Sequence, residues 1–584
     1  MKKNILLSAL FCTFAATAEP LTLTWNGGDS GYLSDDAWSG GVEGHLTPQN
    51  GDALVFPKGG SFINDIDGLK VSALTFTSSA AVALAGEKVI TVMGGGKVHT
   101  SGAGAVSISA PLQMGDGADA EAQGEDDLIN PPAPVIIAAA GSGKKITISG
   151  VISGSAPIAV GAASGTVEFT GNNTFTGKLS VTNGKFNATG KNALGAGEEE
   201  ILFETGNGNG RAKISLNGIT ANKPIRNVPG NIAQEITFVG VCTFNNKFLV
   251  TSDSSPQWMI NSWATVVFNN KLTVVKDLQG SISTGGKIEL KGEGSSIRGF
   301  IMSIYGNQTY YNENKLNNQG AIIVHKPLTL TTDTDWASFG PTFIVDYGIM
   351  KMMVDDAFPN AKYCWNPLRF NRKDDGSIPE YCFFDMNGYS QTFTCIRDDA
   401  KSSSNVIKSD SKNCVLRLMQ NWSQVKSGTS QVAPVFHGEI RGKVSVSVEG
   451  SDSCYFAGPN TSTGSFSLTN QAYCGFTSTG VWKGTNFFVS AGSTLVVSNT
   501  AALPAKSQIR LSDAPEQEVK SSVLLGEGNY TATSMSVDGE LLYRGTWGSS
   551  ESNARFKDDV HFKGPGVLTL TTGAPFPGCR IIIK

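Results

Sequence analysis

The chain has 584 residues, with 46 Lys and Arg against 50 Asp and Glu and a formal net charge of −4. Charged residues make up only 16 % and there are 68 glycines, whereas an ordinary domain has about 25 % charged residues and about 7 % glycine. This composition favours short strands and tight turns over long amphipathic helices. It also lacks the basic blocks that mark a nucleic-acid-binding protein.

The first 18 residues have the pattern of an export signal. Lys2 and Lys3 precede a mostly apolar run over residues 5–16, and Ala16-Thr17-Ala18 is a small-x-small cleavage site. The apolar run is too short to span a membrane, and no later run is long enough. Cys12 does not indicate a lipoprotein, because bulky Phe11 precedes it. We therefore expect an exported bacterial protein that begins near Glu19 and resides outside the cell or at its surface, or else in the periplasm.

Strand patterns follow in chain order at short intervals. Residues 19–114 are expected to form an N-terminal cap and the first β-rungs, with Trp25 and Trp38 closing the open end. Residues 115–134 are acidic and end in Pro-Pro, which favours a solvated loop; a calcium loop is the alternative, but the Asp spacing does not match an EF-hand. The predicted strands cover residues 53–56, 71–76, 88–93, 106–108, 135–139, 145–148, 166–169 and 178–181.

One unit of the sequence occurs twice. FTGNNTFTGKLSVTNG begins at Phe169, and FAGPNTSTGSFSLTNQ begins at Phe456. The two align without a gap, which predicts stacked β-rungs whose inward side chains lie over their equivalents. Within the unit we expect Phe169 and Phe456 to point inward. We expect Asn173 and Asn460 to occupy turns, where Asn tolerates the left-handed conformation and can form ladders of amide hydrogen bonds. Gly177 and Gly464 fit corners that exclude a Cβ atom.

Further motifs carry a resemblance to a known family. They are Asn192-Ala193-Leu194-Gly195, Asp356-Ala357-Phe358-Pro359, Ala501-Ala502-Leu503-Pro504, the segment FDMNGYSQT at 384–392, and the opening TWNGG, AWSGG and GDALVFP. Together they resemble the autotransporter-associated β-strand repeat of bacterial passenger proteins. The resemblance implies passenger-like folding. Because the sequence carries no C-terminal membrane barrel of that family, self-transport is not expected.

The fold expected from these patterns is all-β: a long right-handed parallel β-solenoid (β-helix) with side loops and end caps. Residues 135–540 are assigned to the solenoid. Residues 541–584 are assigned to a C-terminal β-module or cap, which resembles a short module at the ends of secreted repeat proteins.

Eight cysteines remain after the expected signal cleavage. Cys454 and Cys474 each stand two residues before a Phe and are about one rung apart, which would bring their Cα atoms to about 5 Å, within disulfide range. The alternative is that both are reduced core residues. Cys364, Cys382, Cys395 and Cys414 lack the close Cys-x-x-Cys pair typical of structural zinc, so no metal is expected.

Catalytic motifs are missing from the five histidines and from the Gly-rich turns. The enzyme alternative is a β-helix polysaccharide lyase or glycoside hydrolase, in which paired carboxylates work on a sugar. Its candidate residues are Asp355, Asp356, Asp398 and Asp399, with Arg369, Arg372 and Lys373 beside them. Asp-Asp pairs also occur simply as solvated turns and caps.

The repeats, the export signal and the missing catalytic motifs favour a non-catalytic adhesin or scaffold. Its partners are expected to be extracellular glycans, matrix or a cell surface, with no cofactor, no nucleic acid and no transmembrane segment. Long faces with regularly spaced polar groups suit weak multivalent contacts. Tyr363, Trp365, Tyr381 and Tyr389 are candidates for stacking on sugar rings; the alternative is that they are core or cap residues.

Overall fold

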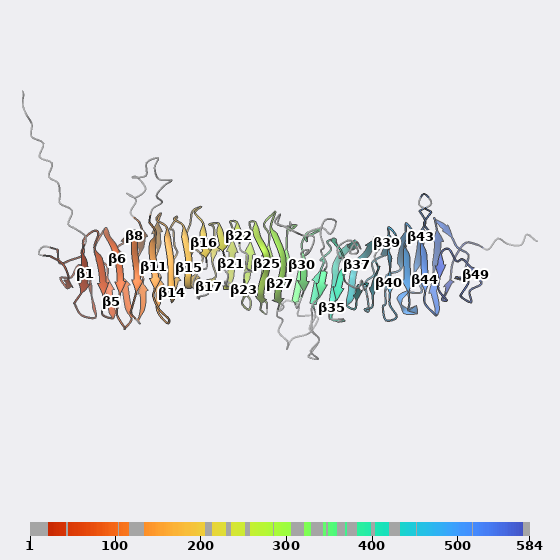
Figure 1. Ribbon diagram of the computed structural model, residues 1–584, viewed down its shortest axis with the longest axis horizontal. Coiled ribbons are helices and arrows are strands. Elements are labelled where there is room, and N and C mark those ends of the chain that lie inside the picture. The colour runs from red at the N-terminus through yellow and green to blue at the C-terminus, as the bar shows by residue number, and fades with distance from the viewer. Residues whose placement is uncertain are drawn as a thin grey trace, which may run out of the picture. The chain divides into compact units, whose positions relative to one another are not determined.

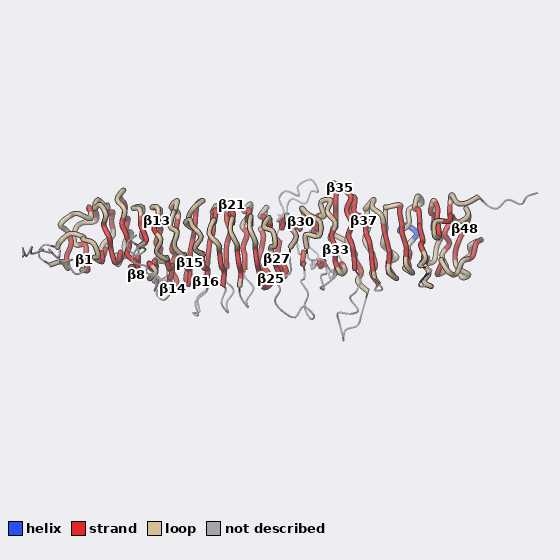
Figure 2. Tube along the Cα trace, turned by 90° about the horizontal axis from the view of Figure 1, so that it is seen from above, coloured by secondary structure: helices blue, strands red, loops and turns tan. Residues whose placement is uncertain are grey.

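The structure is a computed structural model in which the chain forms two compact units, residues 1–179 (unit 1) and 180–584 (unit 2). In both units short parallel strands lie side by side, one rung after another (Figures 1 and 2). The described residues are 21–42, 45–102, 104–115, 133–204, 213–228, 235–251, 257–283, 285–304, 321–328, 343–345, 348–358, 368–370, 382–398, 403–419, 433–450, 453–514, 516 and 518–575.

Unit 1 contains three ladders of parallel strands. The first ladder is β1 (Thr22–Trp25), β4 (Ala53–Phe56), β6 (Leu69–Phe76), β8 (Ile90–Thr100), β11 (Val135–Ala139) and β14 (Ile158–Phe169). The second is β2 (Ser30–Tyr32), β5 (Gly60–Ile63), β7 (Val82–Ala85), β9 (Ala105–Ile108), β12 (Lys145–Ile148) and the end of β14. The third joins the beginnings of β6 and β8 to β10 (Leu112–Met114) and β13 (Ile152–Gly154).

The core of unit 1 is built by stacking like side chains on like. In β4 every second residue is buried, and Phe56 pairs in register with Phe76 of β6. Their rings stack at 5.1 Å between centroids. Because neighbouring strands lie about 4.8 Å apart, parallel in-register pairing brings equivalent side chains into this contact.

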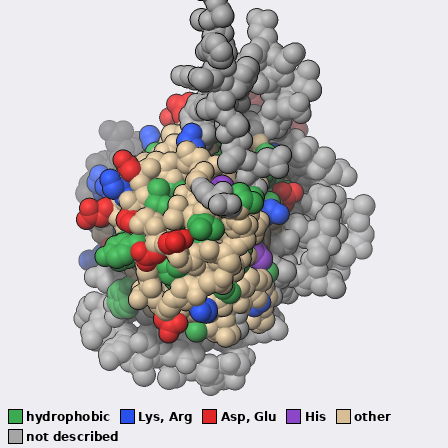
Figure 3. Space-filling view, turned by 90° about the vertical axis from the view of Figure 1, so that its left-hand side faces the viewer, with side chains coloured by type: hydrophobic (Ala, Val, Ile, Leu, Met, Phe, Trp, Pro, Cys, Tyr) green, Lys and Arg blue, Asp and Glu red, His purple; other side chains and the backbone are tan. Residues whose placement is uncertain are grey.

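A cap closes the stack beside β1. Strand β3 (Trp38–Ser39) pairs antiparallel with β1 and so ends the parallel ladder. Trp25 and Trp38 are both buried, and their rings meet edge to face at 5.2 Å. Viewed from this end, the described surface carries scattered charges of both signs (Figure 3). The buried tryptophan pair thus lies where β3 ends the parallel ladder.

Unit 2 continues the same design. One ladder is β15 (Leu179–Thr189, all but its first residue in this unit), β17 (Lys213–Asn217), β20 (Glu235–Val239), β23 (Gln257–Ile260), β25 (Leu272–Ile282), β27 (Ser296–Ile304), β29 (Phe343–Val345), β31 (Leu368–Phe370) and β34 (Ile396–Asp398). A second is β16 (Ile201–Glu204), β19 (Ile225–Val228), β22 (Phe248–Val250) and the beginnings of β25 and β27.

The third ladder of unit 2 is a 15-stranded sheet. Its strands are β18 (Thr220–Ala221), β21 (Val241–Phe244), β24 (Thr265–Phe268), β26 (Lys287–Leu290), β28 (Ala321–Val324), β30 (Gly348–Met352), β32 (Cys382–Asp385), β35 (Asn405–Met419), β37 (Glu439–Glu449), β39 (Phe466–Thr469), β41 (Asn486–Ser490), β43 (Gln508–Ser512), β46 (Ser534–Val537) and β47 (Glu540–Leu541), with β33 (Gln391–Phe393) beside β35. The last pair, β46 and β47, is antiparallel, so a hairpin covers the final edge.

Two smaller sheets complete unit 2. The first is β36 (Val435–Phe436), β38 (Ser453–Phe456), β40 (Tyr473–Phe476), β42 (Thr494–Val497), β44 (Ser522–Leu525) and β50 (Phe562–Lys563). The second is β45 (Asn529–Ala532), β51 (Val567–Leu570), β48 (Gly545–Gly548) and β49 (Phe556–Lys557). A short 3-10 helix, η5 (Thr500–Ala502), precedes β43.

The two copies of the repeated unit make the same contacts. Asn173 and Asn460 are buried, and each side-chain Oδ1 accepts a hydrogen bond from a backbone N–H one rung back, that of Ile152 or Ile440, at 2.9 Å. The predicted amide ladder is therefore replaced at these positions by a clamp from side chain to backbone. A Cβ atom on Gly177 or Gly464 would lie 2.3 or 2.2 Å from a carbonyl oxygen of the preceding rung, which confirms the expected corners.

The predicted all-β parallel solenoid fold is confirmed. Strands β4, β11 and β12 have the predicted bounds, and Phe169 and Phe456 are buried. In the part of the chain that the structure describes, no helix has the length and apolarity needed to cross a membrane.

Candidate functional site

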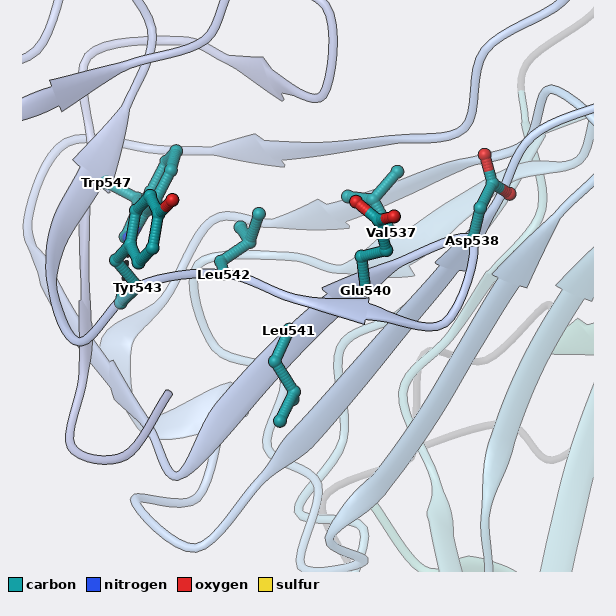
Figure 4. Close-up of a pocket in the computed structure, with 7 residues that line it drawn as sticks. All are labelled: Val537, Asp538, Glu540, Leu541, Leu542, Tyr543 and Trp547. Carbon is teal, nitrogen blue, oxygen red and sulfur yellow. Dashed lines mark hydrogen bonds between the residues drawn. The ribbon is translucent and has the colours of Figure 1, made fainter. Parts of the chain in front are cut away.

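A pocket of about 470 Å³ lies at the C-terminal end of unit 2. In Figure 4 the rings of Tyr543 and Trp547 lie together on one side, and Asp538 and Glu540 lie on the other. Its lining comes from the last hairpin of the long sheet and the segment that follows: Val537, Asp538, Glu540, Leu541, Leu542, Tyr543 and Trp547.

The hairpin between β46 and β47 positions the acidic side. Asp538 and Gly539 form its two-residue turn with φ of 48° and 86°, the left-handed values that Asp-Gly hairpin turns adopt. Asp538 Oδ1 accepts a hydrogen bond from the Asp513 backbone N–H at 2.8 Å. Glu540 is exposed. One carboxylate is thus partly used by the fold, while the other is available to a ligand.

The aromatic side is fixed from behind. Trp547 stacks on Phe556 of β49 at 4.8 Å, and its Nε1 donates to the Tyr543 carbonyl oxygen at 2.8 Å. Both pocket aromatics are only half-buried. An immobilised half-exposed ring opposite carboxylates can take an apolar sugar face on one side and hydroxyl groups on the other.

A charged cluster lies beyond the hairpin. His561 approaches Asp558 through Nδ1 at 2.7 Å and Asp513 through Nε2 at 3.3 Å. Burial acts to raise the pKa of Asp513, but hydrogen bonds from Lys520, the Ser521 N–H and His561 outweigh it, and the pKa lies below its usual range. The cluster ties the end of β43 to the segment before β50, so its role is structural.

Two of the predicted carboxylates, Asp355 and Asp356, act as backbone caps. Asp355 Oδ1 accepts from the Ser390 N–H at 2.5 Å, and Asp356 Oδ1 accepts from the Thr392 N–H at 3.1 Å. Asp356 itself has φ of 44° and donates its N–H to the Ser390 carbonyl. These contacts join the DAFP motif to the FDMNGYSQT motif, which explains both carboxylates without catalysis.

Of the other two predicted carboxylates, the structure describes only Asp398. Asp398 is buried and accepts hydrogen bonds from Asn405 Nδ2 at 2.9 Å and the His437 N–H at 3.0 Å. Arg369 lies in β31, and its side chain is not described. Asp399, Arg372 and Lys373 lie outside the described residues.

Most of the predicted sugar-stacking aromatics also lie outside the described residues: Tyr363, Trp365 and Tyr381. Tyr389 is described and half-buried, in the turn that contains Asn387 and Gly388. The sequence patterns did not identify Tyr543 or Trp547, although both lie in residues 541–584, the expected C-terminal module.

Cys454 and Cys474 pair in register on β38 and β40, and their sulfur atoms are 3.0 Å apart. Both are buried free thiols in this structure. Burial, and secondarily the contact with Cys454, raises the pKa of Cys474 well above its usual value. Cys382, Cys395 and Cys414 are buried, and Cys364 is not described. In the described residues no three His, Cys, Asp or Glu side chains gather to hold a metal ion.

Comparison with protein families, curated proteins and solved structures finds no match to this chain.

Proposed function

We propose that this chain is an exported β-solenoid, secreted or displayed on the cell surface, that acts as a non-catalytic adhesin or scaffold and contacts glycans. The observation that carries the proposal is the C-terminal pocket, where Tyr543 and Trp547 face Asp538 and Glu540. Aromatic rings combined with a few convergent polar groups are the usual composition of a ligand site. The pattern of an export signal in residues 1–18 supports encounter with extracellular glycans.

A scaffold role suits the ladder construction. Each rung contacts its neighbours through backbone pairing, so surface side chains recur at a spacing of about 4.8 Å. Repeated weak contacts along such a surface add up through effective concentration. The backbone-capping roles of Asp355 and Asp356 favour this reading over polysaccharide cleavage, which is the alternative.

A glycan array probed with the purified mature chain tests the binding. We expect binding that falls at least tenfold in Tyr543→Ala and Glu540→Gln, because each removes a pocket contact, and that persists in the control Glu527→Gln, an exposed glutamate outside the pocket. Equal binding by all the variants would contradict the pocket's role. Release of unsaturated or reducing sugar ends from any bound glycan would favour the enzyme alternative.

Cell fractionation tests the location. We expect the mature chain, beginning near Glu19, in the medium or on the cell surface. A chain that retains Met1 in the cytoplasm would contradict export.

A further inference from the structure

Trp263 has a left-handed backbone at a corner where the neighbouring rungs have a left-handed glycine. It lies at the corner between β23 and β24 with φ of 62°. The same corner holds Gly218 and Gly240 in the two preceding rungs, each with φ of 62°, and Gly285 in the next, with φ of 68°. A bulky residue with this backbone conformation is a genuine outlier, and such strain concentrates at functional sites.

The fold gains little burial from this side chain. Trp263 is 62 % exposed, the largest value among the large hydrophobic residues that the structure describes. A Cβ atom on Gly285 would lie 2.5 Å from Cε3 of Trp263, so the indole ring rests directly on the backbone of that glycine. One ring face is therefore supported by the next rung, and much of the ring is left to solvent.

Polar and cationic residues flank Trp263 in the same turn and on the strands that follow. Asn261 and Ser262 precede it in the same turn and are exposed. Thr265 and Lys287 follow on β24 and β26 as register partners on the outer face of the long sheet. A supported ring with flanking donors is the arrangement that takes the apolar face of a sugar and its hydroxyl groups together.

The opposite corner of the same strands carries an exposed amide ladder. Asn245 Nδ2 donates to Asn222 Oδ1, and Asn269 Nδ2 donates to Asn245 Oδ1, both at 2.8 Å. Each of these amides keeps further hydrogen-bonding capacity on the solvent side. Asn222, Asn245 and Asn269 follow directly after β18, β21 and β24. At about 3.3 Å per residue, the stretch from Trp263 through β24 to Asn269 spans about 20 Å.

The charge on this surface is mainly positive. Lys247 and Lys271 follow the amide ladder and are exposed. With Lys287 they form no ion pair within the described residues, whereas Lys291 pairs with Glu289 at 2.7 Å. Glu293, in the adjoining turn, is also exposed.

We propose that Trp263, the amide ladder of Asn222, Asn245 and Asn269, and the lysines beside them form a second glycan site, which binds an anionic polysaccharide. A sugar ring stacks on Trp263, hydroxyl groups bond to the ladder amides, and carboxylate or sulfate groups face the lysines. This inference rests on the proposed glycan contact but places it on the side of the solenoid, away from the terminal pocket residues.

Trp263→Gly is the decisive variant, because it restores the glycine of the neighbouring rungs. The probes are immobilised polygalacturonate and chondroitin sulfate, with cellohexaose as the neutral comparison. We expect the wild-type chain to bind an anionic probe, with affinity that falls as salt rises. Trp263→Gly loses at least about tenfold in affinity, while its thermal midpoint stays at or above the wild-type value. Lys247→Gln with Lys271→Gln weakens binding severalfold and flattens the salt dependence. The matched control Tyr32→Ala, which removes another exposed aromatic, binds as wild type does.

Wild-type affinity in Trp263→Gly, or a lower thermal midpoint, would overturn the inference, the second because it would show that the ring supports the fold. Preference for cellohexaose would refute the anionic assignment. If Tyr543→Ala abolishes polysaccharide binding while Trp263→Gly does not, the proposed function stands and this inference fails. If the wild-type chain binds no glycan, both fail.

Discussion

Removal of the buried amide at Asn460 should open the fold at the second copy of the repeated unit. The Asn460 side chain is fully buried; its Oδ1 accepts from the Ile440 N–H at 2.9 Å, and its Nδ2 donates to the Gly458 carbonyl at 3.0 Å. Ile440 is itself fully buried. In Asn460→Ala the backbone N–H of Ile440 loses the Asn460 Oδ1 acceptor at a position that water does not reach.

The size of the effect follows from those contacts. A buried donor left without a partner costs about 1–3 kcal/mol. The Gly458 carbonyl adds nothing to this cost, because it still accepts a hydrogen bond from the Val481 N–H at 3.2 Å. We therefore expect a local loss of about 1–3 kcal/mol. Asn173→Ala should cost a similar amount, because Asn173 Oδ1 makes the equivalent bond to the Ile152 N–H.

Hydrogen exchange measured by mass spectrometry is the suitable assay, since a repeat array need not unfold in a single step. Peptides that cover β37 and β39 should lose protection by a factor of about 5 to 160, which corresponds to that free energy. Asn529→Ala, at an exposed residue of β45, is the control and should leave exchange unchanged. Wild-type protection in both Asn460→Ala and Asn173→Ala would refute the reasoning.

Three further predictions concern buried or closely packed residues of unit 2. Because burial and the neighbouring thiol keep Cys474 protonated, Cys454 and Cys474 should react with iodoacetamide at pH 7 far more slowly in the native chain than in the unfolded chain. Oxidation of the native chain should join the two cysteines in one cross-linked peptide. A reaction as fast in the native chain as in the unfolded chain would contradict this prediction. Since the folded pKa of Asp513 is lowered, its stabilisation is present above the unfolded carboxyl pKa and is lost as pH falls through the folded value. Asp513→Asn should therefore lower stability by about 1.5–3 kcal/mol at neutral pH and flatten the acid dependence of the thermal midpoint, and an unchanged profile would count against the cluster. In Gly464→Ala the new Cβ atom would lie 2.2 Å from the Val444 carbonyl oxygen, so the free energy of unfolding measured by chemical denaturation should fall by about 1–3 kcal/mol. The control Gly28→Ala has open space around its Cβ atom and should leave the free energy of unfolding nearly unchanged. Equal losses in the two variants would argue against the close approach.

Much of the fold was predictable because it depends on local alternation and repetition. Residues 135–139 and 145–148 alternate or run apolar between turn residues, and they form β11 and β12 with those bounds. The recurrence of Phe, Gly and Asn at equal spacing in two distant segments predicted equivalent burial. What could not be predicted was the bonding of Asn173 and Asn460, because a side chain's partner one rung away depends on how the turns between align.

The surface features were harder to predict for the same reason. Tyr543 and Trp547 face the carboxylates only because an antiparallel hairpin ends the long sheet. No local pattern marks Trp263 as left-handed. Its equivalent in the next rung, Gly285, is recognised only once the strands on both sides of the corner are aligned. The amide ladder does have a sequence signal, because Phe-Asn-Asn-Lys begins at residue 244 and again at residue 268.

The motifs that carry the resemblance have a structural explanation of their own. Gln391 is fully buried; its Oε1 accepts from the Phe358 N–H at 2.9 Å, and its Nε2 donates to the Phe358 carbonyl at 3.1 Å. With the two Asp caps beside it, this clamp locks one motif to the other across more than 30 residues of chain. Residues whose polar groups are used in such hydrogen bonds stabilise the fold, so ligand recognition is left to positions outside the motif. On that argument, variation among chains of this design should concentrate at places such as Trp263 and the terminal pocket, while Gln391 and its backbone partners stay fixed.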